Sequence, residues 1–145
     1  FQLRGLSDYV VKRKNFAFIE KLWRDWSPGW DYPEQEMEHL IDVLGQPGVL
    51  RAALGYYRAA LSLGSLGREA KESAMILVPV ATLALTGARD GCIDSDVFQK
   101  MMYPEDFPQG LKVKQISNAG HFLHQEQPEV VNALLLDWLR KHDDD

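Results

Sequence analysis

Apolar residues in the first half of the chain recur every three or four positions, which is the spacing of one face of an amphipathic helix. The first such stripe predicts a helix over 15–26, with Asn15 placed to cap it. A second stripe predicts a helix over 33–44 that stops at Gly45, and a third runs from about 47 to 61. The expected inner face of the third helix consists of Val49, Leu50, Ala53, Leu54, Tyr57 and Leu61.

The second half of the chain has a different pattern. Residues 78–87 (VPVATLALTG) form an almost continuous apolar run, which is typical of a strand buried on both faces of a parallel sheet. We expect a helix at 94–102, a second strand at 111–117, and a closing helix from 127 to 142 with Pro128 in its first turn. This order predicts an α/β fold whose two strands are parallel. Their carboxyl ends then share one edge, where open parallel sheets build their sites.

The polar stretch 62–73 (SLGSLGREAKES) is the best candidate for a linker. It divides the chain into a helical region of residues 1–61 and an α/β region of residues 74–145. A length of 145 residues and an apolar content of 46% fit an ordinary soluble domain.

The composition excludes several classes of partner. The net charge of −5 argues against nucleic acid or an anionic membrane surface, and no apolar stretch is long enough to cross a bilayer. The single cysteine, Cys92, rules out an internal disulfide and favours a reducing compartment, for which we expect the cytoplasm. Histidine and cysteine do not occur with metal-ligand spacing, and no glycine loop suits a phosphate, so we expect no cofactor and no metal.

Two polar residues follow the predicted strands at equal distances. Asp90 comes four residues after Thr86, where the first strand ends, and His121 comes four residues after Ser117, where the second ends. An aspartate that binds one imidazole nitrogen orients the ring, so that the other nitrogen can act as a base. The spacing alone leaves open that His121 is an ordinary loop residue and that Asp90 is a turn residue beside Gly91.

The segments LVPVATLALTGARDGCI and VKQISNAGHFLHQEQPEVVNALLLDWL closely resemble the last two strand–loop–helix units of the α/β-hydrolase fold. In that family the acid of the catalytic triad lies in a G-x-x-D turn, matched by residues 87–90. The base lies in a G-H turn before a Q-P-E helix start, matched by 120–121 and 127–129. FQLRGL and LGYYRAAL are similar to the first and last parts of the family's helical cap. The resemblance implies a carboxyl-terminal part of the fold, with Asp90 as the acid and His121 as the base.

The family's nucleophile lies upstream of the cap on a sharp elbow, G-x-S-x-G or its equivalent with aspartate, and no such elbow occurs in the sequence. The segment LGSLG, with Ser65, fails because Leu63 occupies the first glycine position. Cys92, beside Ile93, is expected to be a packed side chain. The chain, which begins at Phe1 without a methionine, therefore looks like a hydrolase fragment without its amino-terminal half. We expect it to be inactive alone, with the missing half or a second copy as its partner.

The segment GYYR resembles the part of epoxide hydrolases that carries a cap tyrosine, which donates a hydrogen bond to the epoxide oxygen, and Tyr57 matches that residue. The resemblance implies that Asp90, His121 and Tyr57 act on an epoxide in a small apolar substrate. His124 and Glu126 flank the base and are expected to be solvated or to support it indirectly. An apolar pocket wall is suggested by Phe18, Trp23, Trp26 and Trp30. An esterase of the same fold and a non-catalytic binding module descended from it remain as alternatives.

Overall fold

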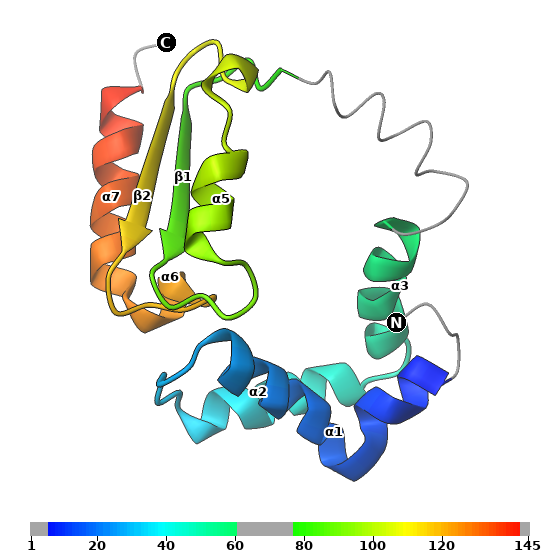
Figure 1. Cartoon of the computed structure of the whole chain (residues 1–145). Helices are drawn as coiled ribbons and strands as arrows, with labels where there is room; N and C mark the ends of the chain where they lie inside the picture. The colour runs from blue at the N-terminus through cyan, green and yellow to red at the C-terminus, as the bar shows by residue number, and fades with distance from the viewer. Residues whose placement is uncertain (1–5, 61–76, 143–145) are drawn as a thin grey trace. The chain divides into compact units, whose positions relative to one another are not determined.

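The computed structural model describes residues 6–60 and 77–142, and the chain divides into two compact units (Figure 1). Among the described residues, the first unit holds those up to Leu22 and those from Asp31 onward to residue 60. The second unit holds Trp23–Trp30 together with the residues from Leu77 onward. The expected linker at 62–73, which includes Ser65, lies outside the described residues, and the domain boundaries stay a prediction.

The first helix, α1 (Leu6–Trp26), is interrupted at the position where its start was predicted. Lys14, Asn15 and Phe16 have φ angles of 54°, 52° and 61°, so Asn15 lies in a left-handed turn and is not a helix cap. Such a conformation costs a residue with a side chain about 1–2 kcal/mol. Phe16, within the turn, enters the same core cluster as Val11, which lies before it, and this burial offsets the cost.

The core of the first unit is formed by α1, α2 (Glu34–Gly45) and α3 (Val49–Ala60). Its buried members are Val11, Phe16, Leu50 and Leu54, against which Phe18, Ile19, Ile41 and Leu44 pack. α2 and α3 correspond to the predicted helices at 33–44 and 47–61, although α3 begins at Val49. Of its expected inner face, Leu50 and Leu54 are buried and Ala53 is exposed, while Leu61 lies outside the described residues. The guanidinium of Arg58 forms an ion pair of 2.6 Å with Asp8.

The second unit is an α/β arrangement, as the sequence predicts. β1 (Thr82–Gly87) and β2 (Leu111–Ile116) are parallel, with Thr82 opposite Leu111 and Gly87 opposite Ile116. The helical elements of this unit are α5 (Ser95–Met101), η1 (Pro104–Asp106), α6 (Leu123–Glu126) and α7 (Pro128–Lys141). In Figure 1, α5 runs beside β1 and α7 beside β2. The core of the unit joins Ile116, Ala119 and Val131.

β1 differs from the expected strand in length and in burial. It begins at Thr82 instead of 78, and Val80 before it is 59% exposed. Only its last two residues, Thr86 and Gly87, are buried, while the others are half-buried. The physical reason is that, within the described residues, the sheet consists of β1 and β2 alone, so that one long edge of β1 has no strand beside it.

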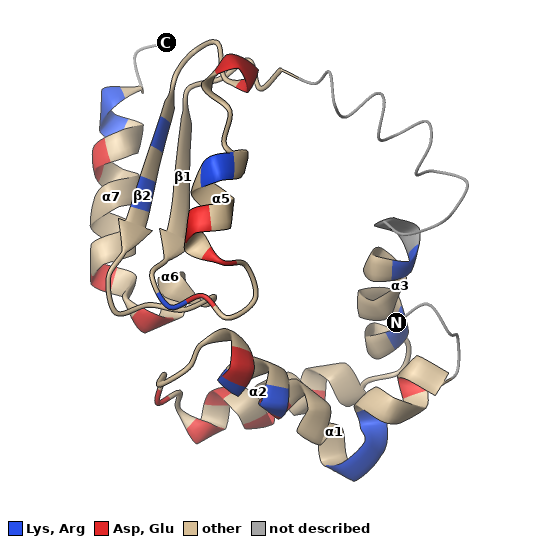
Figure 2. Ribbon diagram, viewed as in Figure 1, with Lys and Arg blue, Asp and Glu red and all other residues tan. Residues whose placement is uncertain are grey.

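Charged residues are unevenly distributed over the elements (Figure 2): α2 carries acidic residues alone, α3 carries arginines alone, and β1 carries no charged residue. Across 6–60 and 77–142, none of the helices combines the length and the apolar character that crossing a membrane requires.

Candidate active site

The structure brings Asp90 and His121 together at the carboxyl edge of the sheet. Nδ1 of His121 lies 3.0 Å from Oδ2 of Asp90 and 3.2 Å from Oδ1. Both residues lie in the turns that directly follow the parallel strands β1 and β2. The side chain of Asp90 is 7% exposed and that of His121 is 29% exposed, so the aspartate is shielded while the imidazole still reaches solvent. The expected contact is present, and its use in catalysis stays a prediction.

The carboxylate of Asp90 is fixed by its own loop. Its Oδ1 accepts hydrogen bonds from the backbone N–H groups of Cys92 at 2.8 Å and Ile93 at 2.9 Å, which form an Asx turn. Because the carboxylate faces Nδ1 of His121, it favours the tautomer with the proton on that nitrogen. Nε2 is then the nitrogen that can take a proton from another group, as a general base must.

The backbone around His121 is held by three successive N–H groups. The N–H of Gly120 donates to both carboxylate oxygens of Glu126 at 2.9 Å. The N–H of His121 donates to the carbonyl of Trp26 at 3.0 Å, and that of Phe122 donates to the hydroxyl of Ser27 at 3.2 Å. The Ser27 hydroxyl in turn donates to Glu126 at 2.7 Å.

The carbonyl of Trp26 also accepts the N–H of Gly91 at 3.0 Å, so one oxygen joins the loops that carry Asp90 and His121. This close approach requires glycine. A Cβ at Gly91 would collide with the carbonyl oxygen of Asp25, and one at Gly120 would lie 2.6 Å from Cα of Ser27.

The sequence pattern did not indicate the hydrogen bonds of the Trp26 carbonyl and the Ser27 hydroxyl, and it left the part of Glu126 open. Glu126 is half-buried and hydrogen-bonded, whereas His124 is exposed. Ser27 is 1% exposed, although it follows the helix end directly in the segment WSPGW. The one available signal was that Ser27, a small polar residue, lies between two tryptophans at a helix end. This signal does not indicate which residue Ser27 binds.

Aromatic rings cover one side of the imidazole. The ring centroids of Trp26 and His121 are 5.1 Å apart in an edge-to-face arrangement. Phe122 contacts Trp23 at 4.9 Å and Trp30 at 5.6 Å, and these two tryptophans stack at 5.3 Å. Three of the four expected wall residues therefore lie near His121. Phe18, the fourth, packs against the core of the first unit.

Tyr57 belongs to α3 of the first unit, and its catalytic role stays a prediction. The apolar spacing predicted that Tyr57 lies on the inner face of its helix. This prediction was wrong, because the residue is 43% exposed. The buried cluster of α3 ends at Leu54, whereas Tyr57 lies almost one turn further on. Its ring meets that of Tyr56 at 5.8 Å and 90°.

Cys92 is exposed, so the expectation of a packed side chain was wrong. Its neighbour Ile93 is itself 45% exposed and does not cover it. Partial desolvation of the thiol raises the pKa of Cys92, and the negative charge of Asp90 raises it further. Because the thiolate is the reactive form, this environment opposes a role as nucleophile.

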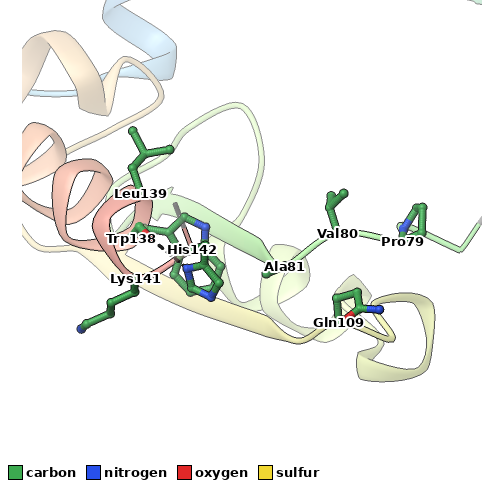
Figure 3. A pocket seen from close by; sticks show the side chains of 8 residues that line it. All are labelled: Pro79, Val80, Ala81, Gln109, Trp138, Leu139, Lys141 and His142. Atoms are coloured by element: carbon green, nitrogen blue, oxygen red, sulfur yellow. Dashed lines mark hydrogen bonds between the residues drawn. The ribbon is translucent and has the colours of Figure 1, made fainter. Parts of the chain in front are cut away.

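A cleft of about 930 Å³ lies at the opposite end of the sheet (Figure 3). It is lined by residues that precede β1 and β2 and by the last turn of α7, among them Val80, Gln109 and Trp138. Neither Asp90 nor His121 lines it. The cleft is therefore separate from the site at the carboxyl edge.

The chain is similar in sequence to proteins named epoxide hydrolase. No family model matches the chain. Epoxide hydrolase 4 of Homo sapiens is 24% identical over 147 residues, which cover 97% of this chain and 38% of that protein. Epoxide hydrolase 3 of Xenopus tropicalis is 28% identical over 146 residues, which cover 97% of this chain and 37% of that protein. The chain thus spans about two fifths of the length of these curated relatives.

Solved structures show the same likeness. A Pseudomonas aeruginosa structure whose name places it with the epoxide hydrolases superimposes with a TM-score of 0.74 at 22% identity. The superposition covers 99% of this chain and 47% of that one. The chain therefore has the fold of the carboxyl-terminal part of an α/β hydrolase. Within this fold class, it resembles the epoxide hydrolases in sequence and in structure.

Proposed function

We propose that this chain supplies the acid and the base of a nucleophile–acid–histidine triad in an α/β-fold hydrolase of the epoxide hydrolase type. The observation that carries the proposal is the 3.0 Å contact between Oδ2 of Asp90 and Nδ1 of His121 at the carboxyl edge of the sheet. Relatives named epoxide hydrolase support the choice of substrate class.

In this reaction an aspartate nucleophile attacks an epoxide carbon, the C–O bond breaks and an alkoxide forms. The Tyr57 hydroxyl donates a hydrogen bond to that oxygen. Nε2 of His121 then takes a proton from a water molecule, and the hydroxide attacks the carbonyl of the resulting ester and breaks its bond to the substrate oxygen. The aspartic acid formed gives its proton to that oxygen, and the imidazolium returns its proton to the first alkoxide. A neutral diol leaves, with the carboxylate and His121 restored. The carboxylate of Asp90 stabilises the imidazolium during this step. The ring of Trp26 beside His121, and those of Trp23 and Trp30 beside Phe122, favour a small apolar substrate.

The nucleophile is proposed to come from protein outside this chain, because its sequence contains no elbow motif. The remaining part of the same protein is its proposed partner. The cytoplasm is the proposed compartment, since the single cysteine suits a reducing environment.

The experiment compares His121→Gln with His124→Gln in the full-length protein, using styrene oxide as substrate. His124 is exposed and three residues from the base, so its replacement is a matched control. His121→Gln should lower turnover by about a thousandfold or more, because hydrolysis of the ester loses its base. His124→Gln should keep nearly full activity. Equal activity of both variants would contradict the assignment.

Mass spectrometry separates the two hydrolase types. In an epoxide hydrolase, His121→Gln should accumulate protein heavier by the mass of one styrene oxide, because the alkyl ester forms but is not hydrolysed. An esterase would show no such adduct and would hydrolyse p-nitrophenyl acetate instead.

A further inference from the structure

The loop that carries His121 is held in place by a side-chain network instead of a sheet or a long helix. Of its three successive N–H groups, Gly120 donates directly to Glu126, and Phe122 donates to Ser27, whose hydroxyl donates to the same carboxylate. Ser27 is 1% exposed, so its hydroxyl depends on these protein partners.

We propose that Glu126 is a positioning residue that orients His121 toward Asp90. The inference rests on the proposed function for its catalytic meaning. A carboxylate accepts stronger hydrogen bonds than a neutral oxygen, and here it accepts two groups that belong to different segments. Without it, the N–H of Gly120 loses its acceptor and the Ser27 hydroxyl loses the group that orients it.

The arrangement extends from Glu126 to the acid. Ser27 follows Trp26, whose carbonyl accepts the N–H groups of both Gly91 and His121. A shift of the segment at 26–27 would therefore move the loops of Asp90 and His121 together. Because a misplacement of about 1 Å can lower a reaction rate a hundredfold, this bracing matters for catalysis as well as for folding.

The test uses NMR on the protein and on four variants: Glu126→Gln, Glu126→Ala, Ser27→Ala and Glu129→Gln. Glu129 lies three residues further on and is exposed, so Glu129→Gln removes the same charge without touching the network. Two properties are measured, the exchange rates of the Gly120 and Phe122 amide protons and the Hδ1 signal of the His121 ring. Neither measurement depends on substrate.

Glu126→Ala should accelerate exchange at Gly120 and Phe122 at least tenfold and broaden the Hδ1 signal, and Glu126→Gln should do so more weakly. Ser27→Ala should accelerate exchange at Phe122 while Gly120 keeps its protection, because Glu126 still accepts its N–H. Glu129→Gln should match the wild type. If Glu126→Ala does not fold, the exchange rates and the Hδ1 signal of Glu126→Gln and Ser27→Ala decide whether Glu126 positions His121.

Unchanged exchange rates and an unchanged Hδ1 signal in Glu126→Gln and Ser27→Ala would overturn the proposal. So would a lower melting temperature without any change at His121, since that is the result of a purely structural role. In the full-length protein, Glu126→Gln should lower kcat about tenfold to a hundredfold with KM little changed. Absence of hydrolysis in the wild type would contradict the proposed function alone, and the NMR results would still decide the role of Glu126.

Discussion

Nδ1 of His121 lies 3.0 Å from Oδ2 of Asp90, although 31 residues separate the two in the chain. The parallel pairing of β1 with β2 explains the contact, because it sends both following loops out of one edge of the sheet. The strand pairing alone does not fix how the two loops lie relative to each other. The carbonyl of Trp26 fixes this, because it accepts hydrogen bonds from the N–H groups of both Gly91 and His121.

Tyr57→Phe tests the proposed role of the tyrosine by removing a single hydroxyl group. In the full-length protein, we expect the rate of epoxide opening to fall by about 10²-fold or more, because the developing alkoxide loses a hydrogen-bond donor. Stopped-flow measurement of ester formation from styrene oxide would record this step. Tyr56→Phe is the matched control, since Tyr56 is the exposed neighbour on α3. An equal rate in both variants would favour the esterase alternative or a structural tyrosine.

Gly91→Ala should destabilise the protein by about 1–3 kcal/mol, because the new methyl group would collide with the carbonyl oxygen of Asp25. Gly55→Ala provides the contrast. Gly55 lies inside α3 with open space where a Cβ would be, so alanine should stabilise the helix by up to about 1 kcal/mol. Urea denaturation of both variants measures these changes. A neutral Gly91→Ala would mean that the loop is not packed against the Asp25–Trp26 backbone.

Asp90→Asn should make Cys92 more reactive. The negative charge of Asp90 raises the pKa of the thiol, so its removal lowers that pKa and increases the thiolate fraction at a fixed pH below it. Asparagine still offers an oxygen to the N–H groups of Cys92 and Ile93, so the turn is kept. Iodoacetamide alkylation as a function of pH follows the effect cleanly, because the chain has one cysteine.

The control for this comparison is Asp94→Asn. Asp94 caps α5, and asparagine caps helices as well as aspartate does. Its variant should alkylate at the wild-type rate. If Asp90→Asn also alkylates at that rate, the charge of Asp90 does not act on the thiol.

The 145-residue chain by itself should be inactive on esters and epoxides and should self-associate. Within the described residues one edge of β1 has no neighbouring strand, and Leu77 and Val80 before it are 55% and 59% exposed. Such an edge with apolar residues beside it invites pairing with another chain. Sedimentation velocity and activity assays on the purified chain test both expectations. A stable monomer that turns over substrate would contradict the assignment of the nucleophile to another part of the protein.

The sequence was sufficient to predict the contact between Asp90 and His121 because the signals for both residues are local. Asp90 and His121 follow strands whose apolar runs can be recognised, and each lies beside a glycine that allows a tight turn. The kink in α1 was not predictable in this way, because Lys14 and Phe16 are residues that rarely adopt a left-handed backbone. The partner of Ser27 could not be predicted either, since a buried hydroxyl identifies the need for an acceptor without identifying which residue fills it.

The bond between Ser27 and Glu126 spans 99 residues of chain, and this separation has a consequence for the order of folding. Closing a flexible loop of that length costs about 4 kcal/mol in chain entropy, whereas the β1–β2 pair is linked by a much shorter crossover. We therefore expect the sheet to form first and the segment of Trp26 to be captured later. Pulse-labelled hydrogen exchange should protect the amides of Thr82 and Ala88, which donate to the carbonyls of Gly110 and Ile116, before those of Gly91 and His121. Simultaneous protection would contradict this order, in which the contact between Asp90 and His121 is among the last features that the folding chain acquires.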